Sequence, residues 1–451
     1  MRSPALALCV LSAMAAPLQA AEPSVELRFQ QMDARIKALE ADGQKLRDQA
    51  AAAIAAADAA RAELEHMKAA QHEAVVASVA APAASSAAAG GANGNAFNPA
   101  ISLILNGVYA HHSLNPDSYQ RAGFPLVDGT GPGDQGFSLG ESEVSFAANI
   151  DDKLYGQLTV SLENEGGDIH TGVEEAYIDT TSLPNGFSLR AGRFFSNIGY
   201  LNSHHSHTDN FVDRPLAYQA FLGNQYGDDG VQLRWVAPTD FFLELGGEAF
   251  RGANYPSGGA THSGVGAKTL FAHAGGDVGI ENSWLAGLSV LKSGTQDGAD
   301  GFSGDNTLYL ADFTWKWAPR GNTKDGGVTL RGEYFIDNRD GAVDLTDPYS
   351  PISVIEPWSG TRHGAYVEGV YRINRRWDAG YRYDKLFASS AGPYASEFDP
   401  LRHTLELTWR NSEFSLLRVQ YSHDEPNAEH SDNAFYLQYQ VSLGAHGAHK
   451  F

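Results

Sequence analysis

The chain has 451 residues and a formal net charge of -22, with 43% hydrophobic and 11% aromatic residues. This composition excludes a helical membrane bundle, which would need repeated apolar spans of ~20 residues. The acidic balance excludes nucleic acid as a partner, because binding phosphate groups requires an excess of Lys and Arg.

The N-terminus has the features of an export signal. Arg2 precedes an apolar run over residues 5–16 that is too short to span a bilayer, and Ala20 or Ala21 offers a small residue for cleavage. The only cysteine, Cys9, lies inside this segment. We therefore expect residues 1–20 to be a signal peptide and the exported chain to contain neither disulfides nor thiol chemistry.

Residues 22–76 show a heptad pattern, which predicts an α-helical coiled coil in the periplasm. Apolar positions with 4, 3 spacing include Val25, Phe29, Met32, Ile36 and Leu39. Alanines fill the middle of this seam, so a single solvated helix is the alternative. Residues 77–97 are rich in Ala, Ser and Gly, which predicts a flexible linker before the next domain.

From residue 98 to residue 451 the sequence alternates between apolar and polar residues. Leu405, Leu407 and Trp409, for example, alternate with polar or charged residues, as expected for strands whose two faces differ. The candidate strands are 100–111, 137–150, 154–163, 171–180, 187–194, 230–236, 241–251, 269–280, 283–292, 306–317, 327–336, 362–373, 377–386, 401–410, 413–423 and 433–443.

Three features favour a transmembrane barrel over a soluble sandwich. The polar face is heavily charged, and the apolar face is rich in aromatic residues. Short turns, such as 150–153, 372–376 and 410–413, alternate with long segments at 113–135, 196–229, 339–360 and 387–400, and the chain ends in Phe451. We predict an all-β fold, a closed antiparallel barrel of about 16 strands with an aqueous interior and an inward loop near residues 196–229.

The sequence resembles a known family in this region. Residues 189–195 (LRAGRFF), 210–216 (NFVDRPL) and 227–233 (GDDGVQL) are similar to phosphate-selective porins of the O/P type, closest to the subgroup labelled zinc-regulated outer-membrane proteins. This resemblance implies an outer-membrane homotrimer through which small hydrophilic solutes or ions diffuse. Only seven lysines follow residue 98, however, so the sequence does not predict phosphate selectivity.

Charge suggests which ions such a pore would prefer. Residues 98–451 contain 44 Asp or Glu and 24 Lys or Arg. If these acids face the lumen, the pore is expected to lean towards cations. If they lie on outer loops, they would instead serve solubility or bind divalent ions that bridge lipopolysaccharide. The porin hypothesis requires no cofactor and places outer-membrane lipid and lipopolysaccharide around the barrel.

Candidate pore residues are the charged side chains of the strands and of the inward loop. Arginines on the strands are expected to line the wall and to pair with carboxylates. The pore or constriction candidates are Arg190, Arg193, Asp213, Arg214, Arg234, Glu333, Arg382 and Asp384.

A histidine cluster supports an alternative function. His204, His205, His207 and Asp209 place three imidazoles and a carboxylate within six residues, a donor set suited to zinc. The alternative to the porin hypothesis is therefore a metal-responsive transport or binding protein. A remote third hypothesis is an outer-membrane hydrolase. The G-x-S-x-G match at residues 136–140 opens a strand rather than a strand–turn–helix, so we do not predict an enzyme.

Overall fold

A computed structural model describes residues 37, 99–165, 168–258, 264–295, 298, 300–346 and 354–444. Apart from residue 37, the predicted signal peptide, coiled coil and linker lie outside the described residues. The chain divides into two compact units, and every strand below belongs to the second, Asn93–Phe451. Among the helices of the described residues, none is both long and apolar enough to cross a membrane.

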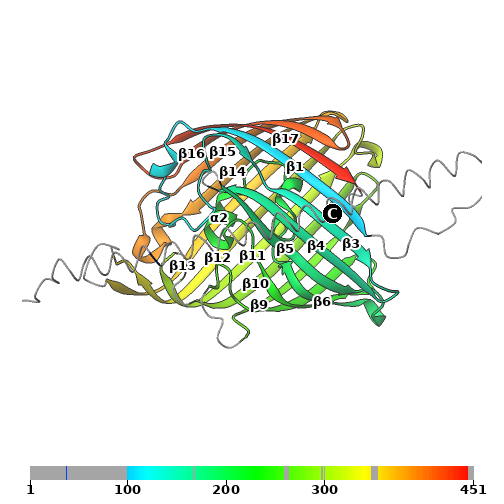
Figure 1. Cartoon of the computed structure of the whole chain (residues 1–451), viewed down its shortest axis with the longest axis horizontal. Coiled ribbons are helices and arrows are strands. Elements are labelled where there is room, and N and C mark those ends of the chain that lie inside the picture. Colours follow the sequence, from blue (N-terminus) through cyan, green and yellow to red (C-terminus); the bar gives the residue numbers. More distant parts are fainter. Residues whose placement is uncertain are drawn as a thin grey trace, which may run out of the picture. The chain divides into compact units, whose positions relative to one another are not determined.

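The described residues form one antiparallel sheet in which strands that follow one another in sequence lie side by side (Figure 1). The strands are β1 (Ala100–His111), β2 (Gly136–Leu139), β3 (Ser142–Asn149), β4 (Leu154–Glu165), β5 (Asp168–Thr180), β6 (Phe187–Phe195), β7 (Gly227–Val236), β8 (Phe242–Phe250), β9 (Ala267–Val278), β10 (Asn282–Thr295), β11 (Phe302–Trp317), β12 (Gly327–Asp344), β13 (Ile355–Arg372), β14 (Trp377–Phe387), β15 (Leu401–Ser412), β16 (Ser415–Glu425) and β17 (Asp432–Gly444).

The sheet closes into a barrel because its last strand pairs with its first. β1 pairs with β17 from Ser102 opposite Gly444 to His111 opposite Phe435. β2 and β3 both pair with β1, so they occupy a single position that is interrupted at residues 140–141. The described strands therefore fill sixteen positions, and the predicted antiparallel barrel is confirmed.

The two faces of the barrel differ as the alternating sequence predicts. In β15, Leu405 and Leu407 are 57% and 42% exposed on the outside, whereas Thr404, Glu406 and Thr408 between and beside them are buried on the inside. Burial of polar groups and exposure of apolar groups is the reverse of a soluble protein. An outer surface of this kind matches the hydrocarbon region of a bilayer.

Most connections at one end of the barrel are short, and the longest connections lie at the other end. Residues 150–153, 279–281, 373–376 and 413–414 make tight turns, whereas residues 112–135, 196–226 and 388–400 form long loops. The expected long loop at 339–360 is shorter than predicted, because β12 continues to Asp344 and β13 already begins at Ile355. The start of β1 and the end of β17 both lie on the short-turn side of the barrel.

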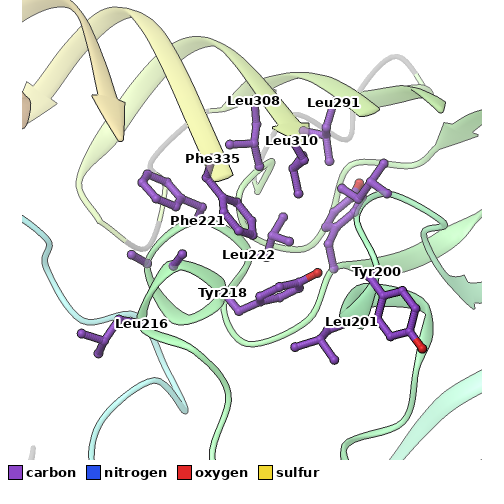
Figure 2. Close-up of a cluster of buried hydrophobic side chains, with 14 of the residues drawn as sticks. Tyr200, Leu201, Leu216, Tyr218, Phe221, Leu222, Leu291, Leu308, Leu310 and Phe335 are labelled. Carbon is purple, nitrogen blue, oxygen red and sulfur yellow. The ribbon is translucent and has the colours of Figure 1, made fainter. Parts of the chain in front are cut away.

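The interior is not aqueous throughout, which corrects the expectation from the sequence. The helix α2 (Leu216–Leu222) is fully buried inside the barrel. Figure 2 shows Tyr218, Phe221 and Leu222 of α2 facing Leu308, Leu310 and Phe335 of the wall. β11 and β12 thus have apolar residues on both faces near the middle of each strand, because the inner face there packs against α2 rather than against water.

Gly364 on β13 lets α2 approach the wall closely. A Cβ atom there would lie 2.7 Å from side-chain atoms of both Phe221 and Leu386. We expect Gly364→Val to lower the free energy of unfolding by about 1–3 kcal/mol through overpacking. Gly369→Val on the outer face of the same strand is the control, since its Cβ would meet only the flexible Leu330 side chain. Urea unfolding in detergent would measure both, and equal stabilities would contradict the packing seen here.

Candidate functional site: the loop that crosses the barrel

The segment of residues 196–226 between β6 and β7 crosses the inside of the barrel. It contains two short 3-10 helices, η3 (Leu201–Ser203) and η4 (Ser206–Thr208), followed by α2. His207 meets Glu143 of β3 on one side, and the Asn210 amide donates to Glu368 of β13 on the other. We call residues 196–226 the crossing loop; it is three residues shorter than the expected 196–229, because β7 begins at Gly227.

Glu333 of β12 fastens the crossing loop to the wall. Its buried carboxylate accepts hydrogen bonds from the Tyr218 hydroxyl at 2.9 Å and from the Tyr366 hydroxyl at 2.7 Å. The backbone N–H groups of Tyr200 and Leu201 donate to the same carboxylate at 3.1 and 3.2 Å. This candidate pore residue therefore positions the loop instead of facing open solvent.

Asp213 connects the loop to the arginines of β14 and β15. Its carboxylate pairs with Arg382 at 3.1 Å and with Arg402 at close range, and it accepts from the Gln420 amide at 2.7 Å. Burial alone would raise the pKa of Asp213, but the two arginines outweigh burial and hold that pKa below its ordinary value. Arg382 also binds Asp384 at 2.8 Å, so three of the predicted residues meet here.

Asp209 and Arg214 pair with one another inside the loop. The Arg214 Nε atom lies 2.9 Å from an Asp209 carboxylate oxygen, and the guanidinium also donates to the backbone carbonyls of Leu201 and His204. Burial raises the pKa of Asp209 to about 6, against the opposing effect of Arg214. The structure thus places Asp209 on an arginine rather than with the neighbouring histidines.

The three predicted histidines separate into two environments. His204 stacks on the Tyr200 ring, with ring centroids 4.6 Å apart, and its Nδ1 lies 2.7 Å from the Tyr200 carbonyl oxygen. His205 and His207 turn the other way, towards β3 and β5. Among the described residues, the groups of ligand atoms that lie within 4.8 Å of one another contain these two histidines but neither His204 nor Asp209.

His205 is surrounded by carboxylates. Its Nδ1 lies 3.2 Å from Glu143 and 3.1 Å from Glu174, and its Nε2 lies 3.0 Å from Glu175. His207 Nδ1 is 2.8 Å from the other oxygen of Glu143. Burial disfavours a charged imidazole, but the carboxylates outweigh it and raise the pKa of His205 well above its ordinary value. The acidic wall therefore favours the charged form of the His205 imidazole.

Arg190 and Arg234 lie on the inner face of the barrel. Arg190 makes a two-pronged salt bridge to Asp179, with N–O distances of 2.8 and 2.7 Å, and its guanidinium lies over the Tyr177 ring. Arg234 is 3.7 Å from Glu244 and 3.9 Å from Asp179. These pairs hold neighbouring strands of the acidic wall together.

Arg193 does not face the pore, which corrects the prediction. It pairs with Asp229 at 3.4 Å, and both side chains are substantially exposed. Strand residues alternate between faces, so Arg190 shares the inner face with the buried Phe194, and Arg193 shares the outer face with Leu189. A separation of three residues along a strand reverses the face, and for this reason Arg190 and Arg193 cannot both line the lumen.

Cavities remain on the short-turn side of the crossing loop. One measures about 700 Å³, and its lining is mainly basic, whereas an acidic cavity of about 410 Å³ lies beside it. Charged residues of the first are Lys316, Arg331, Arg372, Arg410 and Arg418 together with Asp209 and Glu413; those of the second are Glu244, Asp277 and Asp312. Opposite charges therefore line different sides of the space below the loop.

Several residues of this site are not among the candidates from the sequence. Glu143, Glu174 and Glu175 hold the loop histidines, and Arg402 completes the Asp213 cluster. Strand alternation places Glu143, Glu175 and Arg402 on inner faces, and this shared inward direction is the feature of the sequence that could have identified them. Only the paired strands show which of these residues meet the loop.

The comparisons with known proteins agree with the observed fold. No protein-family model matches this sequence. A protein of Aquifex aeolicus (strain VF5), described as an uncharacterized protein, is 28% identical over 391 residues, which cover 79% of this chain and 80% of that protein.

Solved structures with similar folds are outer-membrane proteins. The outer membrane channel DcaP of Acinetobacter baumannii has a TM-score of 0.50 and 13% identity, covering 77% of this chain and 97% of that one. The anion-selective porin from Comamonas acidovorans has a TM-score of 0.49 and 10% identity, covering 77% of this chain and 99% of that one. The likeness to DcaP shows that this chain has the fold of an outer-membrane β-barrel channel.

Proposed function

We propose that this protein is an outer-membrane channel for the passive diffusion of small hydrophilic solutes or ions, and that the crossing loop forms its constriction. The observation that carries this proposal is the combination of an apolar outer face with charged cavities beside a loop held across the lumen. A closed barrel satisfies every backbone group in lipid without filling its interior.

The surroundings of the channel belong to the same proposal. The exposed apolar side chains of the barrel would contact lipid, and the exposed ends would contact lipopolysaccharide. A homotrimer and a periplasmic N-terminal helix are also part of the proposal. They rest on the family resemblance and on the heptad pattern of residues 22–76.

Conductance in planar bilayers tests the proposed function. We expect discrete current steps when the purified protein is added to one side of the membrane, because water and ions pass beside the crossing loop. A properly folded protein that gives no current steps would contradict the proposal.

We further propose a weak cation preference, which the acidic excess favours and the basic cavity opposes. Neutralising two basic side chains of that cavity, with Lys316→Gln and Arg372→Gln together, is expected to increase the cation preference. The interaction energy of two unit charges ~8 Å apart in water is about 0.5 kcal/mol. Removing one charge of the cavity should therefore change the permeability ratio roughly two-fold.

The reversal potential in a salt gradient measures this effect. Arg320→Gln is the matched control, because Arg320 lies in the connection between β11 and β12 with its side chain 77% exposed. A reversal potential that does not change in the double variant, or that changes as much in the control, would show that this cavity is not on the ion path.

A further inference from the structure

A β-bulge in β5 turns an additional carboxylate towards the lumen. Thr159 of β4 pairs with Glu175, but the next residue, Val160, pairs with Val173. Glu174 is therefore an extra residue in the ladder. Its side chain and that of Glu175 both reach His205 of the crossing loop, although two successive residues of a regular strand would face opposite ways.

A second irregularity, where β2 meets β3, also turns a carboxylate towards the lumen. Gly107 of β1 pairs with Leu139, whereas Ile104 pairs with Glu143, so the stretch between β2 and β3 contains one residue more than β1 opposite it. Glu141 lies in this stretch. Its carboxylate comes within 4.8 Å of a ligand atom of Glu143 and of one of Glu174. Bulges that aim side chains in this way are common beside functional sites.

The crossing loop contributes nitrogen donors to two overlapping groups of ligand atoms at this position. Ligand atoms of Glu141, Glu143, Glu174 and His205 all lie within 4.8 Å of one another, as do those of Glu143, His205 and His207. The side chains of Glu143, Glu174 and His205 are 2%, 12% and 18% exposed. Carboxylate and imidazole donors gathered at one nearly dry position form the mixed oxygen and nitrogen set that suits Zn²⁺ and related ions.

When all four are ionised, the carboxylates at this position outnumber their positive partners, and either protonation of a carboxylate or a bound cation would balance the charge. Glu141, Glu143, Glu174 and Glu175 carry four negative charges when ionised, whereas His205 and His207 supply at most two positive ones. Arg190 interacts with Glu175, but it is also committed to its salt bridge with Asp179. Buried carboxylates with a net negative charge are costly, and a divalent cation would compensate it.

We propose that Glu141, Glu143, Glu174, His205 and His207 form a binding site for one divalent transition-metal ion, with Zn²⁺ as the best-suited candidate. The ion would join β3 and β5 to the crossing loop and so hold the constriction in place. This consequence for conduction rests on the proposed channel function, but metal binding itself does not. The ligand set also differs from the one expected from the sequence, because Glu141, Glu143 and Glu174 replace His204 and Asp209.

Metal binding is measured on the folded full-length protein in detergent, after treatment with a chelator. We expect Zn²⁺ titration followed by calorimetry and elemental analysis to give one ion per chain. The double variant Glu143→Gln with His205→Gln is expected to weaken binding at least about 100-fold, since it removes an oxygen and a nitrogen ligand. Ca²⁺, which prefers an all-oxygen shell, is expected to bind more weakly than Zn²⁺.

His204→Gln is the matched control, because this neighbouring histidine faces Tyr200 and should leave Zn²⁺ affinity unchanged. Glu174→Gln keeps the contact between Glu143 and His207, so a loss of zinc in this variant is not explained by release of the loop at Glu143. X-ray absorption of the bound zinc should show both imidazole and carboxylate ligands. Absence of zinc from the wild type, or equal binding in the double variant, would overturn the site. A protein without this metal site would still conduct ions in bilayers. Failure of the metal-site proposal can therefore be distinguished from failure of the channel proposal.

Discussion

A Glu333→Ala variant is expected to detach the crossing loop from the wall and to lower the free energy of unfolding by about 3 kcal/mol or more. Two tyrosine hydroxyls and two backbone N–H groups donate to this carboxylate inside the barrel. Each buried donor left without an acceptor costs about 1–3 kcal/mol, less whatever water restores. Urea unfolding in detergent and protease cleavage within residues 196–226 would measure stability and loop release separately.

Two comparisons show whether the carboxylate itself is responsible. Glu333→Gln retains one acceptor oxygen and should have an intermediate effect, whereas Glu356→Ala, at an exposed position on β13, should have little. If Glu333→Ala unfolds at the wild-type urea concentration and its loop resists protease equally, then Glu333 does not hold the loop.

An Asp213→Ala variant is expected to cost about 3 kcal/mol of stability and to shift ion selectivity towards anions. Asp213 is the partner shared by Arg382 and Arg402, whose side chains are only 1% and 7% exposed. Removing one member of a buried ion pair leaves the other charge uncompensated, typically at a cost of 3–5 kcal/mol. Here the second partners of the arginines, Asp384 and Asp424, reduce that cost.

Asp213→Asn separates the two effects. It retains the size of the side chain and an acceptor for Gln420 but loses the negative charge. We therefore expect the selectivity shift of the alanine variant together with a smaller loss of stability. Reversal potentials and urea unfolding would be measured on both. An unchanged reversal potential in both variants would show that permeating ions do not sense this cluster.

Most of the barrel could be predicted because strand alternation is a local property. Leu405 and Leu407 identify an outer face from the sequence alone, and long and short connections follow from the spacing between strands. The packed region around α2 also has a signal in the sequence. Leu308, Tyr309 and Leu310 are consecutive apolar residues, as are Tyr334, Phe335 and Ile336, which indicates apolar surroundings on both faces of the strand.

The loop contacts could not be predicted, because they join residues far apart in the chain. His205 meets Glu143, Glu174 and Glu175 only through the strand register and the fold of the loop. The bulge at Glu174 is invisible to a pattern of period two, because it reverses the alternation at one residue. The pairing of Asp209 with Arg214, rather than with the histidines, likewise depends on how the loop turns.

The claim that the barrel encloses a water-filled path can be tested with a pair of neighbouring residues on β12. Thr329 faces the inner cavities, whereas Leu330 is 44% exposed on the outer face. The only native cysteine, Cys9, lies in the predicted signal peptide, so a single introduced cysteine should be the only thiol of the exported chain.

A charged, water-soluble thiol reagent added to bilayer channels is therefore the most direct measurement. We predict that it reacts with Thr329→Cys and reduces the current, and that it leaves the current of Leu330→Cys unchanged because lipid covers that position. Reaction at Leu330→Cys alone, or no reaction at Thr329→Cys in channels that conduct, would contradict a lumen lined by the inner face of this barrel.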